Sequence, residues 1–223
     1  MKMTIYVRLA VGLILLLIIT SNSYASSFQV AGHVLLGTTS GDQDSSGFGV
    51  LAQASGQVYP RVYLSADIFA ATARSIADKT LAPFESLTQQ FTHIGGRYAV
   101  LQDLHLTAYL GAGYAIYGYQ YRDGVAGSDG YDLRGQGPYG QVFVQSHSNG
   151  KINFEGEANV SWLAKFQDNA GKSEGTLSSV RGKVGYTMMS GLSLEATLLS
   201  NRAVYGNGTI TSTWYGLGVS YRF

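Results

Sequence analysis

The sequence of 223 residues contains no cysteine and only three prolines, and its 15 basic side chains nearly balance its 14 acidic ones. The lack of cysteine excludes a disulfide scaffold as a source of stability in an exported chain. The balanced charge gives no reason to expect nucleic-acid binding, which depends on a basic surface. After residue 25 no apolar run approaches 18 residues, so no later segment is a candidate membrane-spanning helix. The 16 tyrosines instead favour strands, and the 29 glycines argue against a mostly helical chain.

The first 25 residues have the three parts of a secretory signal peptide. Lys2 and Arg8 give a positive start, residues 9–19 form an apolar run, and Ser23-Tyr24-Ala25 is a small-x-small cleavage site. The run is about half of the ~20 residues that a membrane-spanning helix requires. We therefore expect cleavage after Ala25, and the absence of cysteine near this site excludes a lipoprotein anchor. Because Lys2 and Arg8 leave with the signal, the mature chain carries one acidic side chain in excess.

Residues 211–223 alternate two kinds of side chain, as a β-strand does. The side chains on the even-numbered face are mostly small or polar. Those on the other face are Thr211, Thr213, Tyr215, Leu217, Val219, Tyr221 and Phe223.

Nine further alternating segments precede this one, separated by clusters of Gly, Asn, Asp and Ser. They are 27–37, 47–56, 59–72, 88–100, 104–119, 137–147, 151–166, 176–188 and 192–204. In most of them the even-numbered side chains are apolar; in 151–166 this face includes Ala158, Val160, Trp162, Ala164 and Phe166. The odd-numbered side chains are small or polar. An apolar outside and a polar inside are typical of a transmembrane barrel.

A soluble β-sandwich also alternates and is the main competing interpretation. The apolar faces, however, carry almost no charge over the central residues of each strand, which a face in contact with water would not show. Hydrocarbon offers no partner to an open sheet edge, so a sheet in a membrane must close. We therefore predict an all-β fold, a transmembrane antiparallel up-and-down β-barrel of about ten strands in one domain, residues 26–223.

The connections predict how this barrel is oriented. Gaps near 57–58, 101–103, 148–150 and 189–191 are short, whereas most of those between the other strand pairs are longer, as periplasmic turns and extracellular loops are. Aromatic residues near strand ends are candidates for the two interfacial girdles. They are Phe28, Tyr98, Phe154, Phe166, Tyr186, Tyr215, Tyr221 and Phe223.

The signal peptide, the alternating strands and the final Tyr215-x-Leu217-x-Val219-x-Tyr221-Arg222-Phe223 together resemble the small outer-membrane β-barrels typified by opacity proteins, OmpX and the OmpA barrel. In that group a C-terminal Phe preceded by alternating aromatic or aliphatic residues is an assembly signal. The resemblance implies an outer-membrane location in a Gram-negative bacterium. It also implies contact with membrane lipid and lipopolysaccharide, recognition by the barrel-assembly machinery, and a possible extracellular ligand at the loops. These relatives typically have eight strands, which remains the alternative if 47–56 or 88–100 is a loop.

Seven charged side chains have the parity of the barrel interior. They are Asp67, Arg97, Glu155, Glu157, Arg181, Lys183 and Glu195. Acids and bases on adjacent antiparallel strands suggest cross-strand ion pairs. Such a network either lines a path for ions or protons, or forms a plug together with aromatic side chains of the same parity. Small barrels fill their interiors with side chains, so we favour the plug.

The sequence offers little evidence of catalysis, and we predict a protein without enzymatic activity, cofactor or metal. His147-Ser148 only partly matches the His-x-Ser pair of a lipid A deacylase barrel family, and Ser-Asn-Gly is a turn signal. Omptin-like proteases also use ten strands, but their acidic and His-containing pairs have no matching motif here. His33, His93 and His105 are isolated in sequence and inward by parity, which favours packing in the interior.

The sequence therefore predicts a structural or surface-interaction role, similar to adhesion, through the extracellular loops. A narrow, porin-like channel is the alternative, and a lipid A-modifying enzyme is a third hypothesis.

Overall fold

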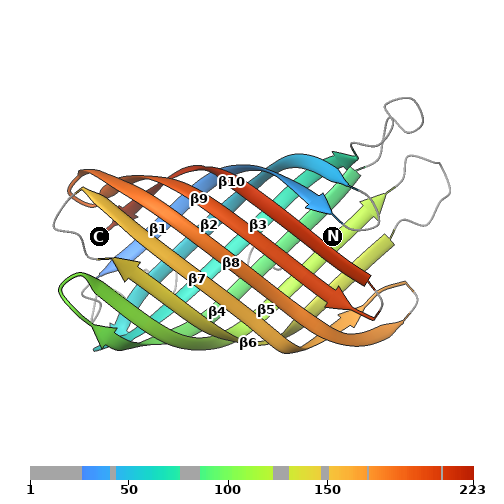
Figure 1. The fold of residues 1–223 in the computed structure, drawn as a ribbon, viewed down its shortest axis with the longest axis horizontal. Helices are drawn as coiled ribbons and strands as arrows, with labels where there is room; N and C mark the ends of the chain where they lie inside the picture. The colour runs from blue at the N-terminus through green and yellow to red at the C-terminus, as the bar shows by residue number, and fades with distance from the viewer. Residues whose placement is uncertain are drawn as a thin grey trace.

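The computed structural model describes residues 27–40, 44–75, 86–122, 131–146, 151–169, 171–206 and 208–223. Within these ranges the chain forms ten antiparallel strands that close into one barrel (Figure 1). The strands are β1 (Phe28–Ser40), β2 (Ser45–Tyr59), β3 (Val62–Ser75), β4 (Ser86–Gln102), β5 (Leu106–Arg122), β6 (Tyr131–Ser146), β7 (Ile152–Gln167), β8 (Lys172–Met189), β9 (Leu192–Tyr205) and β10 (Gly208–Arg222). Each strand pairs with its neighbours in sequence, and β1 closes the ring against β10.

The predicted fold class is confirmed, with ten strands. Segments 47–56 and 88–100 belong to β2 and β4, so the alternative of eight strands is wrong. The predicted signal peptide lies outside the described residues. In the part of the chain that the structure describes, no helix has the length and apolar character needed to cross a membrane.

The two ends of the barrel differ. The connections β2–β3, β4–β5, β6–β7 and β8–β9 lie at one end, here the turn end, where the chain also finishes at Phe223 (Figure 1). The other five connections lie at the opposite end, here the loop end. The two longest connections between strands, residues 76–85 and 123–130, are both at the loop end. This is the predicted arrangement of turns and loops.

Near the middle of the strands the apolar side chains change from the outer face of the barrel to the inner face, as in β9. On the turn side of this strand the outward side chains are apolar up to Leu198, and the inward ones are polar up to Thr197. On the loop side the pattern is largely reversed, because Leu199 and Ala203 are buried inside while Arg202 is exposed outside; Asn201, buried inside, is an exception.

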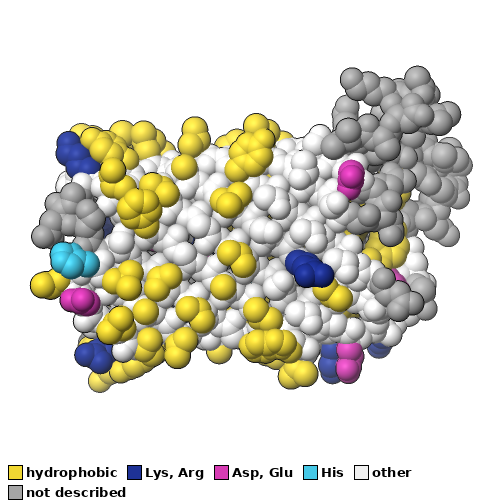
Figure 2. Space-filling model, in the orientation of Figure 1, with side chains coloured by type: hydrophobic (Ala, Val, Ile, Leu, Met, Phe, Trp, Pro, Cys, Tyr) yellow, Lys and Arg dark blue, Asp and Glu magenta, His cyan; other side chains and the backbone are white. Residues whose placement is uncertain are grey.

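The same reversal occurs around the ring. The last outward apolar residue is Leu36 in β1, Ala70 in β3, Val180 in β8 and Tyr215 in β10. Buried inward side chains at the same level are Leu35, Phe69, Leu177 and Trp214. The turn half of the barrel is therefore apolar outside and polar inside, as hydrocarbon requires. The loop half is polar outside with an apolar core, like a water-soluble protein. On the face seen in Figure 2, hydrophobic side chains gather toward the turn end.

Exposed aromatic side chains mark the borders of the turn half. Tyr59, Tyr98, Phe154, Tyr186, Tyr221 and Phe223 lie near the turn end. Phe48, Tyr114, Trp162 and Tyr215 lie near the level of the reversal. Such rings are typical of the two membrane interfaces.

Phe166 was predicted to face lipid, and this prediction is wrong. A β-bulge between Ser161 and Ala164 inserts an extra residue, so that Trp162 and Leu163 both point outward, 70% and 72% exposed. Beyond the bulge the parity is inverted. Ala164 and Phe166, both predicted outside, are therefore buried in the interior.

Candidate functional site

The interior of the turn half contains the seven charged side chains that the sequence singled out. Arg181 of β8 binds two of the carboxylates. Its Nη1 donates to Oδ2 of Asp67 at 3.1 Å, and its Nη2 donates to Glu157 of β7. Because β3, which carries Asp67, stands opposite β8 in the ring, this ion pair crosses the full width of the lumen.

Lys183 links two other carboxylates. Its Nζ lies 2.8 Å from Oε2 of Glu155 and 3.1 Å from Oε1 of Glu195. Glu195 also accepts a hydrogen bond from Ser220 at 2.6 Å and contacts Nε2 of His33 at 2.9 Å. Six of the seven predicted charges are therefore brought into direct ion pairs.

Arg97 stands apart from these pairs. Its guanidinium carbon lies 3.8 Å from the ring centre of Phe143, 5.1 Å from that of Tyr109 and 5.8 Å from that of Tyr63. Neither an ion pair nor a hydrogen bond joins it to any residue that the structure describes. Cation–π attraction therefore holds this side chain.

Neutral side chains complete the network, and the sequence analysis did not identify them. Gln53 donates to Oδ1 of Asp67 at 3.0 Å, Gln145 donates to Oε1 of Glu155 at 3.3 Å, and Asn159 donates to Glu157. Their inward parity and the strand register were available signals. Gln53 is the cross-strand partner of Asp67, and Gln145 is that of Glu155. Buried carboxylates need this second layer of donors, because an unsatisfied charge is costly away from water.

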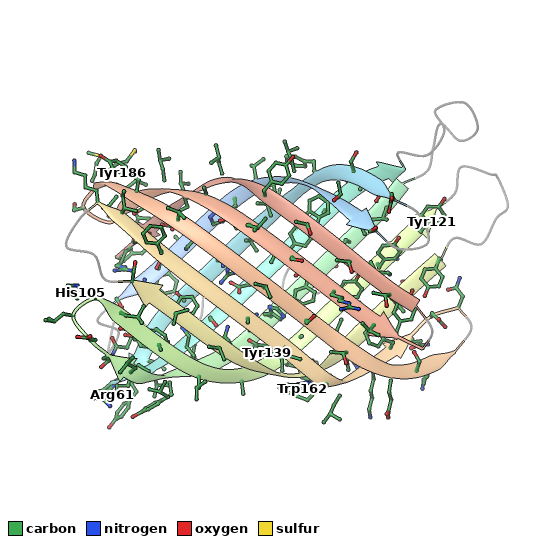
Figure 3. The ribbon with its side chains drawn as sticks, in the orientation of Figure 1. Arg61, His105, Tyr121, Tyr139, Trp162 and Tyr186 are labelled. Carbon is green, nitrogen blue, oxygen red and sulfur yellow. The ribbon has the colours of Figure 1, made fainter. Side chains whose placement is uncertain are left out.

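The histidines are less isolated than the sequence suggested. His33 contacts Glu195, and Nδ1 of His93 lies 3.3 Å from the amide nitrogen of Asn159. His105 is exposed in the β4–β5 turn instead of pointing inward (Figure 3).

His93 also lies close to two carboxylates. Ligand atoms of Asp67, His93 and Glu157 all lie within 4.8 Å of one another, a donor set that suits a divalent metal. Arg181 already binds both carboxylates and supplies the positive charge there. The residues therefore fit an internal ion pair better than a metal centre.

In the loop half an apolar core fills the lumen. The rings of Phe69 and Trp214 lie 5.3 Å apart, and those of Phe166 and Tyr205 lie 5.5 Å apart. Trp214 and Leu133 are completely buried. In Figure 3 Tyr139 lies inside the barrel, whereas Trp162 points away from its wall. Packed rings and the Arg181–Asp67 bridge thus block the lumen at two levels.

A small cavity remains on the turn side of this core. Its volume is about 30 Å³, and its lining includes Asp67, Arg97, Glu155, Arg181 and Lys183. The His147-Ser148-Asn149 segment, considered for catalysis from the sequence, lies outside the described residues.

No family model matches the chain, and no curated protein matches it. Solved structures do. The outer membrane protease OmpT from Escherichia coli aligns over 92% of this chain and 100% of its own, with a TM-score of 0.66 and 13% identity. The fold is that of an outer-membrane β-barrel. At such identity the likeness concerns the fold alone.

Two further solved structures align with lower TM-scores. Neisserial surface protein A aligns over 89% of this chain and 99% of its own, with a TM-score of 0.47 and 14% identity. Ail, the attachment invasion locus protein of Yersinia pestis, aligns over 88% and 98%, with a TM-score of 0.40 and 8% identity. The finer resemblance to opacity proteins and OmpX stays a prediction.

Proposed function

We propose that this protein is a closed, non-enzymatic barrel of the Gram-negative outer membrane that presents its loop end to partners outside the cell. The observation that carries the proposal is the Arg181–Asp67 ion pair, which joins opposite walls of the lumen. A barrel bridged in this way, with an aromatic core above the bridge, is suited to hold loops rigidly. It is poorly suited to conduct solutes.

The polar exterior of the loop half supports a role outside the membrane. Arg134, Lys165, Lys172 and Arg202 are exposed on the outer wall there. Charged side chains on a lipid-facing surface are destabilising, so this half of the wall belongs above the hydrocarbon. The five loop-end connections would then stand on a stalk formed by the strands themselves, and exposed loops often carry binding functions.

The expected partners follow from this placement. Membrane lipid would surround the turn half, and lipopolysaccharide would contact the outer wall near the level of the reversal. The barrel-assembly machinery would recognise Tyr215, Leu217, Val219, Tyr221 and Phe223 during insertion, after export directed by residues 1–25. An extracellular ligand would bind at the loops.

Cell-binding assays test the surface role directly. Bacteria that display the wild-type protein would be compared with bacteria that display a variant lacking residues 124–129, at equal surface amounts. Less adhesion to host cells, or to immobilised lipopolysaccharide, is the expected result for the shortened loop. A surface-interaction role would be contradicted if bacteria with the wild-type protein, with the variant and without the protein all adhered equally to every surface.

A narrow channel is the second candidate, favoured by the charged turn half and its cavity. Recording from planar bilayers separates the two functions. We expect no unit currents from the wild-type protein. Stable currents whose size changes in Arg181→Gln or Glu157→Gln would establish a pore and reject the plug.

A lipid-modifying activity is tested separately. Lipid A from cells with and without the protein is expected to give identical mass spectra. A change that disappears in His147→Ala would show that the protein is an enzyme.

A further inference from the structure

One buried cation in the turn half has no counter-charge of its own. Arg97 is only 8% exposed, and its Nε has no hydrogen-bond partner among the described residues. Arg181 and Lys183 differ from it, since each of them binds two carboxylates. A guanidinium that leaves water normally needs an anionic or polar partner in its plane.

The aromatic rings around Arg97 satisfy only part of this need. Phe143, Tyr109 and Tyr63 attract the guanidinium through their π-electrons at 3.8, 5.1 and 5.8 Å from their ring centres. The five N–H donors of arginine, however, point outward in the plane of the group. Stacked rings cannot accept these in-plane donors, so the rings leave the donors of Arg97, Nε among them, without an acceptor among the described residues.

Arg97 borders the cavity of about 30 Å³, together with Arg181 and Lys183. Asp67 and Glu155 border it as well, but both are already engaged. Asp67 accepts from Arg181 and Gln53, and Glu155 binds Lys183 and Gln145. Both glutamines are also among the residues that line the space.

The size of the cavity restricts what it can hold. About 10–15 Å³ of such space accommodates one water molecule. The cavity therefore has room for two or three water molecules, or for one ion of halide size.

We propose that this cavity binds one halide-sized monovalent anion through Arg97, with Arg181 and Lys183 as the further positive charges. The site lies on the turn side of the apolar core, so the ion enters from the turn end. The bound anion would link β4, which carries Arg97, to β8, which carries the other two cations. Among the described lumenal charges four carboxylates face three cations, and Arg97 is the cation that pairs with none of the carboxylates.

Thermal unfolding of the refolded protein in detergent tests the site. The midpoint would be followed by the heat-dependent gel shift, in sodium chloride or bromide against sodium gluconate at constant ionic strength. We expect the wild-type midpoint to rise with the logarithm of halide concentration, as linkage to a folded-state ligand requires. The rise should be absent in Arg97→Met, which removes the charge and keeps an apolar side chain between the rings.

Arg202→Met is the matched control, because it removes an exposed cation from the outer wall and should keep the full halide response. An equal response in Arg97→Met, or no response in the wild type, would overturn the proposal. Crystals of the wild type grown in bromide give a second measurement if Arg97→Met does not fold. An anomalous peak within hydrogen-bond distance of Arg97 supports the site, and a cavity that holds water alone refutes it.

Discussion

Replacing Arg181 by methionine should lower the free energy of unfolding by about 3 kcal/mol. Removing one partner of a buried ion pair typically costs about 3–5 kcal/mol, because the other charge stays buried without compensation. Here two carboxylates would lose their cation, on opposite walls of the lumen. We expect the lower limit of that range, since Asp67 keeps its hydrogen bond from Gln53 and Glu157 keeps that from Asn159.

The measurement is a urea titration of the protein folded into lipid vesicles, followed by tryptophan fluorescence. Arg134→Met is the control, because the Arg134–Asp132 pair is exposed on the outer wall and should contribute at most about 1 kcal/mol. Adding Asp67→Asn and Glu157→Gln to Arg181→Met should recover most of the loss, since no uncompensated charge would then remain.

Two results would refute this reasoning. One is an Arg181→Met variant within about 1 kcal/mol of the wild type, which would mean that water or relaxation satisfies the carboxylates. The other is a triple variant as unstable as the single one. That outcome would assign the loss to the packing of the arginine side chain instead of its charge.

Three further comparisons test the packing and the terminal signal. Trp214→Ala should lower the free energy of unfolding by about 3–5 kcal/mol, because it leaves a cavity in the apolar core. Trp162→Ala should lower it much less in the same urea titration, because that side chain is 70% exposed on the outer wall. Gly216→Ala should prevent or strongly weaken refolding, since a Cβ there would collide with the carbonyl oxygen of Val34 in β1. Gly182→Ala has open space and should refold normally. Phe223→Ala should reduce the amount of heat-modifiable barrel in cell membranes. The melting of the refolded protein should change little, because Phe223 is 70% exposed. Assembly in cells equal to that of the wild type would show that Phe223 is not part of the assembly signal.

The strands of the turn half could be predicted from the sequence because hydrocarbon imposes a strict rule on each of them. Outward residues must be apolar there, and runs such as Leu192–Leu198 follow this rule without exception on the even-numbered face. The loop half obeys the opposite rule. Prediction from outward apolar residues therefore began β6 and β8 too late, at residues 137 and 176, whereas these strands begin at Tyr131 and Lys172.

Other features depend on closure of the ring and have no local signal. The side chains of Arg181 and Asp67 meet because a barrel of ten strands places β8 opposite β3. His33 meets Glu195 for the same reason, through the pairing of β1 with β10 and of β10 with β9. The bulge that turns Phe166 inward breaks the period of two, and no residue type at this position announces it.

The mid-strand reversal also fixes how deeply the barrel is immersed. A shift of the barrel toward its turn end would carry Lys165 and Arg202 into hydrocarbon, at about 2–4 kcal/mol each near the bilayer midplane. A shift the other way would transfer Leu198 and Val180 from lipid to water, at about 1.5–3 kcal/mol for each large side chain. Both displacements are opposed around the whole circumference, so the loop end is kept at a constant height above the lipid, whatever happens at its tips.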